Sequence, residues 1–154
     1  MTTPASKPEA HVIDASDLTV GVISARWNHA IVERLHAGAI AAASARSAMV
    51  VDETAPGAFE LPFAARVLAR SGAVDALVVL GAVIRGETTH YELVSEGCAT
   101  GVMSVQLDSG VPIGFGVVTV EDHEQAMARS GADHNVGADA MCAALEMARL
   151  AARW

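Results

Sequence analysis

Aromatic side chains are scarce in this chain of 154 residues, forming 4% of it although 52% of the residues are hydrophobic. Alanine, valine and leucine must therefore build the core, and such small residues let helices and strands approach closely. With only two tryptophans present, the place of each is informative. Trp27 directly follows a predicted buried strand, where it either packs in the core or stacks on a flat heterocycle.

Cysteine is equally rare, and the two residues present, Cys98 and Cys142, fall within helical patterns. No C-x-x-C pair or comparable ligand spacing occurs, so we expect no metal and no cofactor. His123 and His134 have acidic neighbours but no metal-site spacing, and we interpret both as solvated. Two free, buried thiols fit a reducing compartment and predict a cytoplasmic protein.

Two further absences limit the partners. The longest strongly apolar run, near residues 76–84, is far too short to cross a bilayer, and residues 1–18 lack the basic and apolar segments of a secretory signal. Basic residues number 10 against 18 acidic ones, which gives a net charge of −8. Because nucleic acids require clustered cations, we expect neither nucleic acid nor membrane as a partner.

Short apolar segments alternate with segments of helical periodicity along the chain. We predict strands at residues 19–25, 48–53, 76–84 and 112–120, and helices at 28–44, 60–71, 89–107, 121–129 and 136–153. This order predicts an α/β three-layer sandwich of the flavodoxin-like type, with a four-stranded parallel sheet between helices. Residues 1–17 form a predicted N-terminal arm, in which residues 11–13 are a candidate edge strand, and residues 18–154 form one domain.

Polar residues gather where the predicted strands end, and in a parallel sheet these ends share the edge at which ligands bind. The third strand runs into Gly86, two threonines and His90 before the next helix begins. Backbone N–H groups at a helix start attract phosphate, and a neutral histidine there can accept a proton. The spacing from Thr89 to Glu92 also fits a capping box, which would leave His90 as an exposed residue of an ordinary helix start.

The other junctions each allow two interpretations. Glu60 follows the turn at Pro56 and Gly57, where it either favours the helix start or binds hydroxyl groups of a polyol, and spacing alone favours the first. Arg129, near the end of the fourth helix, either stabilises that helix end or clamps a phosphate. Asn28 is predicted to cap the first helix.

Taken together in this order, the junctions resemble the lumazine synthase (6,7-dimethyl-8-ribityllumazine synthase) family. The resemblance runs from about Leu18 to the C-terminus and rests on five segments: Arg26-Trp27-Asn28, residues 56–62 (PGAFELP), residues 83–90 (VIRGETTH), Phe115-Gly116 with Thr119, and residues 124–129 (EQAMAR). It implies two small-molecule substrates, 5-amino-6-(D-ribitylamino)uracil and 3,4-dihydroxy-2-butanone 4-phosphate. The implied products are 6,7-dimethyl-8-ribityllumazine, phosphate and water, in the penultimate step of riboflavin biosynthesis, with no cofactor or metal.

The resemblance also implies a role for each segment. The aminopyrimidine and its ribityl chain would contact Trp27, Asn28, Ala58, Phe59, Glu60, Val83, Ile84 and Phe115. Glu87 and Thr88 would offer backbone N–H groups to the phosphate, Arg129 would bind it as a cation, and His90 would transfer the proton. In the family, the residues matching Phe115 and Arg129 come from the neighbouring subunit, which implies a homopentamer, closed in some members into a shell of sixty subunits.

Two positions favour a rival interpretation. Val136 stands where many members have a lysine, which removes a cation from the implied phosphate site, and Glu87 adds an acid beside it. Both would suit a non-catalytic relative that binds lumazine or flavin, or forms a shell. The enzyme is favoured by four retained residues: Trp27, Glu60, His90 and Arg129. The sequence leaves the choice between pentamer and shell open.

Overall fold

A four-stranded parallel sheet forms the centre of the computed structural model, which describes residues 6–7, 9 and 11–154. The strands are β1 (Thr19–Ala25), β2 (Met49–Ala55), β3 (Ala76–Ile84) and β4 (Ile113–Val120), in the order β2-β1-β3-β4. The first seven residues of β3 are buried, because a sheet covered on both faces needs an apolar run without alternation. The predicted parallel sheet is confirmed.

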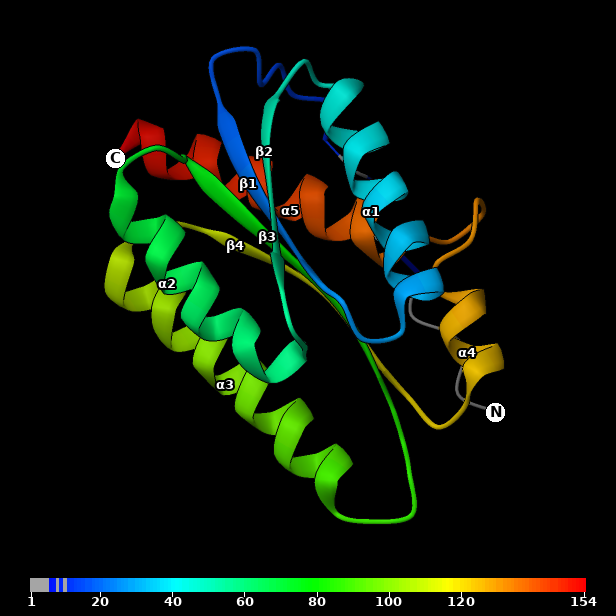
Figure 1. Ribbon diagram of the computed structural model, residues 1–154. Helices are drawn as coiled ribbons and strands as arrows, with labels where there is room; N and C mark the ends of the chain where they lie inside the picture. Colours follow the sequence, from blue (N-terminus) through cyan, green and yellow to red (C-terminus); the bar gives the residue numbers. More distant parts are fainter. Residues whose placement is uncertain (1–5, 8, 10) are drawn as a thin grey trace.

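Helices cover both faces of this sheet, as Figure 1 shows. The helices α1 (His29–Ser44) and α5 (Val136–Arg153) lie on one face, and α2 (Leu61–Ser71) and α3 (His90–Ser109) lie on the other. The 3₁₀ helix η1 (Ala58–Glu60) precedes α2, and the short helix α4 (His123–Ala128) follows β4. The predicted three-layer sandwich is therefore confirmed, with a separate apolar core on each face of the sheet.

The strand order determines where a ligand can enter. The chain leaves β1 through α1 toward β2 and leaves β3 through α3 toward β4, so the connections diverge from two adjacent strands. In open parallel sheets, such a divergence leaves a crevice at the carboxyl ends of the two strands, and ligands bind there. The fold therefore points to the residues that follow β1 and β3.

The candidate edge strand at residues 11–13 does not form. The backbone N–H of His11 instead donates to the Glu146 carboxylate at 3.3 Å, and Arg149 donates to the Asp14 carbonyl at 2.6 Å. Both partners belong to α5, so this part of the arm lies along that helix. Among the described residues, no strand pairs with the outer edge of β2. Residues 1–5, 8 and 10 of the predicted arm lie outside the described residues.

The two cysteines are free thiols: Cys98 is buried and Cys142 is half-buried. Burial raises the pKa of the Cys98 thiol to about 11, so it is protonated at neutral pH and cannot serve as a nucleophile. No helix in the described part of the chain has the length and apolar character needed to cross a bilayer.

Candidate active site

Two residues after β1 face the crevice. Trp27 is 73% exposed, which excludes its interpretation as a core aromatic. Asn28 adopts a left-handed backbone conformation (φ 55°, ψ 46°), which asparagine tolerates better than most residues. Its side-chain Nδ2 donates to the Ala82 carbonyl at 2.8 Å and makes no cap bond to α1. Asn28 therefore occupies the predicted N-cap position of α1, but its side chain joins the end of β1 to β3 instead of capping the helix.

The turn after β2 brings a carboxylate close to the indole of Trp27. A Cβ atom on Gly57 would lie 3.1 Å from both Trp27 Cδ1 and Glu60 Oε2, so the absence of a side chain there allows the two groups to converge. Glu60 immediately precedes α2, but its side chain makes no cap bond. Its carboxylate is therefore free to accept hydrogen bonds from a ligand.

The segment after β3 leads into α3, which begins at His90, one residue after the predicted start at residue 89. Thr89 occupies the N-cap position, yet its side chain makes no cap bond, and the His90 N–H donates to Thr88 Oγ1 at 3.3 Å instead. Glu92, the other half of the predicted capping box, binds Arg85. The capping box was therefore wrong because an arginine from the preceding strand end competes for the glutamate. Residues 85–90 are all exposed.

A cavity of about 570 Å³ lies at the carboxyl ends of β1 and β3. This volume falls in the ordinary range for small-molecule sites. Eight of the predicted site residues line it: Trp27, Asn28, Ala58, Phe59, Glu60, Val83, Ile84 and His90. The cavity thus combines an exposed indole, an apolar wall, one carboxylate and one imidazole.

Four lining residues are not among the predicted site residues: Gly57, Ala82, Leu93 and Val94. The last two belong to α3. They follow His90 by three and four positions, so they lie on the same face of α3 as the histidine. Helical spacing counted from His90 would have identified them. They add apolar surface beside the imidazole.

Four predicted site residues are not among those that line this cavity: Glu87, Thr88, Phe115 and Arg129. Phe115 lies in β4, paired with Val79 and 39% exposed. Arg129 follows α4, where its Nη1 donates to the Gln125 carbonyl at 3.0 Å. Among the described residues, no lysine or arginine lines the cavity. One chain therefore offers an aromatic ring, apolar contacts and a hydroxyl-binding carboxylate, but no cation for a phosphate.

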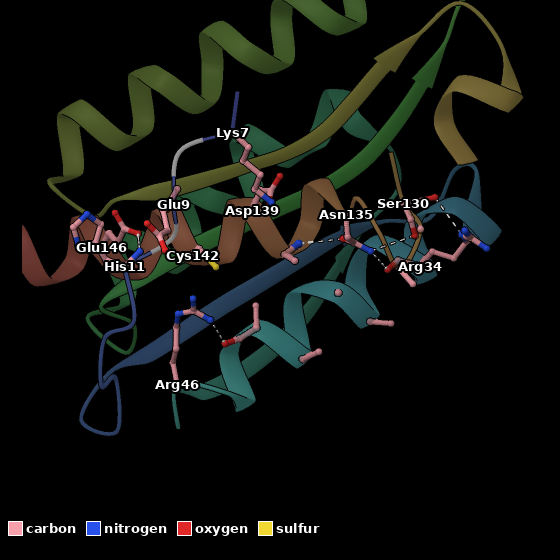
Figure 2. A pocket seen from close by; sticks show the side chains of 18 residues that line it. Lys7, Glu9, His11, Arg34, Arg46, Ser130, Asn135, Asp139, Cys142 and Glu146 are labelled. Carbon is pink, nitrogen blue, oxygen red and sulfur yellow. Dashed lines mark hydrogen bonds and ion pairs between the residues drawn. The ribbon is translucent and has the colours of Figure 1, made fainter. Parts of the chain in front are cut away.

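A larger groove, of about 1060 Å³, lies between α1 and α5 (Figure 2). Three residues of the arm line it, Lys7, Glu9 and His11, and Lys7 is paired to Asp139. Many of its lining residues are alanines and glycines that let the two helices pack closely, and none of the predicted site residues lines it. Within the described ranges, no three His, Cys, Asp or Glu side chains are arranged to hold a metal ion. The smaller cavity is therefore the candidate active site.

Comparison with known proteins agrees with this choice. Residues 17–152 match the family model described as 6,7-dimethyl-8-ribityllumazine synthase. The chain is 47% identical to the 6,7-dimethyl-8-ribityllumazine synthase of Deinococcus deserti, with 92% of this chain and 93% of the relative aligned. It is 48% identical to that of Thermococcus kodakarensis, with 85% of each aligned, and 44% identical to that of Corynebacterium efficiens, with 95% and 92% aligned. The chain belongs to the 6,7-dimethyl-8-ribityllumazine synthase family.

Proposed function

We propose that this chain catalyses the condensation of 5-amino-6-(D-ribitylamino)uracil with 3,4-dihydroxy-2-butanone 4-phosphate to 6,7-dimethyl-8-ribityllumazine. The main support is the cavity at the carboxyl ends of β1 and β3, which is lined by an exposed indole, a free carboxylate and an imidazole. The names of the relatives, which align over most of the chain, point to the same reaction.

The cavity suits the aminopyrimidine substrate. The exposed face of Trp27 stacks on the pyrimidine, and the backbone at Val83 and Ile84 reads the edge of the ring. Glu60 accepts hydrogen bonds from the ribityl hydroxyls, beside the backbone of Ala58. Asn28 accepts a hydrogen bond from the ribityl chain through its side-chain oxygen, because its Nδ2 already donates to a carbonyl of β3.

The reaction needs positioning and proton transfer more than it needs a special reagent. The amine of the pyrimidine attacks the ketone, water leaves, and an imine forms. His90 takes a proton from the carbon beside the former carbonyl, the C–O bond to phosphate breaks, and the phosphate leaves. Ring closure and loss of a second water give the lumazine. Holding the two substrates together supplies much of the rate.

A complete site requires a second subunit in this proposal. In the part of the chain that the structure describes, no lysine or arginine lines this cavity, and Arg129 and Phe115 lie outside it. In a homopentamer these two residues would serve the cavity of the adjacent subunit, as the resemblance implies. Such a contact between subunits could bury the exposed apolar side chains of α2 and α3, which are Phe63, Val67, Leu93, Met103 and Leu107. Light scattering would distinguish a pentamer from a shell of sixty subunits.

The direct test of the reaction is an assay of the purified chain with both substrates, followed by lumazine absorbance. We expect lumazine to form well above the uncatalysed background reaction. If the chain binds the aminopyrimidine but adds nothing to the background rate, the enzyme proposal fails. The non-catalytic binding protein would then be the correct function.

The acid at position 87 gives a prediction about the phosphate site. Glu87 is exposed and belongs to the predicted phosphate cradle, so a carboxylate that faces the phosphate would repel it. We expect Glu87→Gln to lower the KM for the phosphate substrate by about twofold to fivefold at low salt, and less at high salt. The control is Glu96→Gln, which removes an exposed acid further along α3. An unchanged KM at low salt would show that the Glu87 carboxylate points away from the phosphate.

A further inference from the structure

Arg85, the first residue after β3, binds carboxylates from two different elements. Its Nη1 pairs with Glu92 in the first turn of α3, and its Nε lies 2.9 Å from Oε2 of Glu121, the residue after β4. The guanidinium carbon lies 4.2 Å from the ring centroid of Tyr91, a cation–π contact. The Arg85 backbone N–H donates to the Val120 carbonyl at 2.9 Å. One residue therefore joins β3, the start of α3 and the end of β4.

The loop of residues 86–90, between Arg85 and Glu92, makes few other contacts with the rest of the domain. A Cβ atom on Gly86 would meet nothing within 4 Å, and the four residues after it are exposed. The bond from the His90 N–H to Thr88 Oγ1 lies within the loop and does not tie it to the sheet. The ion pair between Arg85 and Glu92 therefore holds the loop against the rest of the domain.

The acidic residues around this loop make Arg85 important for the binding of a phosphate, because its positive charge offsets theirs. Glu87 and Glu92 lie within and next to the predicted phosphate cradle in the sequence, and the fold brings Glu121 to Arg85 from the end of β4. Arg85 pairs with Glu92 and Glu121. The second oxygen of Glu92, Oε2, is buried without a hydrogen-bond partner in the described part of the chain. The Arg85 guanidinium holds the pKa of Glu92 below its ordinary range. Without Arg85, an uncompensated carboxylate would lie beside the phosphate.

The same contacts reach the segment that carries Arg129. The backbone N–H of Glu121 donates to Gln125 Oε1 at 3.0 Å, and Arg129 Nη1 donates to the Gln125 carbonyl at 3.0 Å. Arg85 therefore contacts, through Glu121, the helix end from which Arg129 projects.

We propose that Arg85 is a positioning residue for the phosphate substrate: through Glu92 and Glu121 it fixes the loop of residues 86–90, whose backbone N–H groups bind the phosphate. Its guanidinium is already engaged by two carboxylates and the Tyr91 ring, so it is not itself the phosphate ligand. The inference rests on the proposed function, because it requires a substrate that carries a phosphate.

Kinetic constants of the full-length, assembled protein test this role. We expect Arg85→Met to raise the KM for the phosphate substrate about tenfold and to leave the KM for the pyrimidine within about twofold, because only the phosphate loop is misplaced. Arg85→Lys should give an intermediate KM, since an ammonium group is a point charge that cannot span both carboxylates as the guanidinium does. Glu92→Gln should also raise the KM for the phosphate substrate.

The matched control is Arg149→Met, which removes an arginine that also makes a surface clamp, with Asp17 and the Asp14 carbonyl, far along α5. If Arg85→Met has the kinetic constants of this control, the inference is overturned. A lower KM in Glu92→Gln would overturn it too, because the freed guanidinium would then be binding the phosphate directly. An equal rise of both KM values in Arg85→Met would equally contradict a role confined to the phosphate.

Hydrogen exchange without substrate tests the loop independently of catalysis. The Leu93 amide, which donates to the Thr89 carbonyl at 3.3 Å, should exchange faster in Arg85→Met than in wild type or Arg149→Met, because the start of α3 is no longer held by its ion pair with Arg85. Unchanged exchange would overturn the inference. If the wild-type chain forms no lumazine, the proposed function fails, and the exchange result still decides whether Arg85 holds this loop.

Discussion

The variant His90→Ala is expected to turn over on the order of 100-fold more slowly than wild type, with both KM values changed by less than about threefold. The imidazole lines the cavity at the first residue of α3, where it can reach a substrate that Trp27 and Glu60 hold in place. Its removal takes away the proton acceptor and leaves the binding surface. The activity that remains comes from positioning the two substrates. Measurements of kcat at saturating concentrations of both substrates would check this.

A matched histidine serves as the control for this variant. His123 is also exposed and is also the first residue of a helix, but it does not line the cavity. We expect His123→Ala to retain the wild-type kcat. An unchanged kcat in His90→Ala would remove His90 from the proton-transfer step. A rise in both KM values as large as the fall in kcat would make it a binding residue instead.

The fold was predictable because its determinants are local. The apolar run of β3 and the helical periodicity on either side of it depend only on nearby residues, and the order of these elements implies a parallel sheet. Residues 11–13 show where this reasoning fails. Their apolar character suits an edge strand, but acceptors and donors on α5, far away in the sequence, hold the arm along the helix.

Long-range partners also explain which parts of the site the sequence did not predict. The residues around the cavity were predictable, because polar and aromatic residues follow the predicted strands. The carboxyl ends of parallel strands lie at one edge of the sheet, so these residues come together there. The bonds made by Asn28 and Glu92 were not, since local spacing assigned both to helix caps. Asn28 instead binds a carbonyl of β3, and Glu92 binds Arg85. A side chain that local spacing assigns to a helix cap bonds elsewhere when the fold brings it an opposite charge or a second hydrogen-bond partner.

The variant Arg129→Ala is expected to raise the KM for the phosphate substrate by about 10-fold to 100-fold, the usual effect of losing a hydrogen bond to a charged group. The KM for the pyrimidine should stay close to wild type. The alternative role is structural, because the Arg129 side chain also donates to the Gln125 carbonyl within α4 at 3.0 Å. That role predicts a lower thermal midpoint and equal effects on both KM values. Arg129→Lys separates charge from geometry, since lysine cannot form the bidentate pair.

Mixed assemblies test whether Arg129 serves a neighbouring site. His90→Ala and Arg129→Ala subunits, unfolded together and reassembled at equal amounts, should recover about one quarter of the wild-type activity when each site takes the two residues from different subunits of a ring. A site that takes both residues from one chain would recover nothing, because each subunit lacks one of them. Each variant reassembled alone provides the baseline. Activity no higher than these baselines would show that Arg129 does not serve the site of the neighbouring subunit.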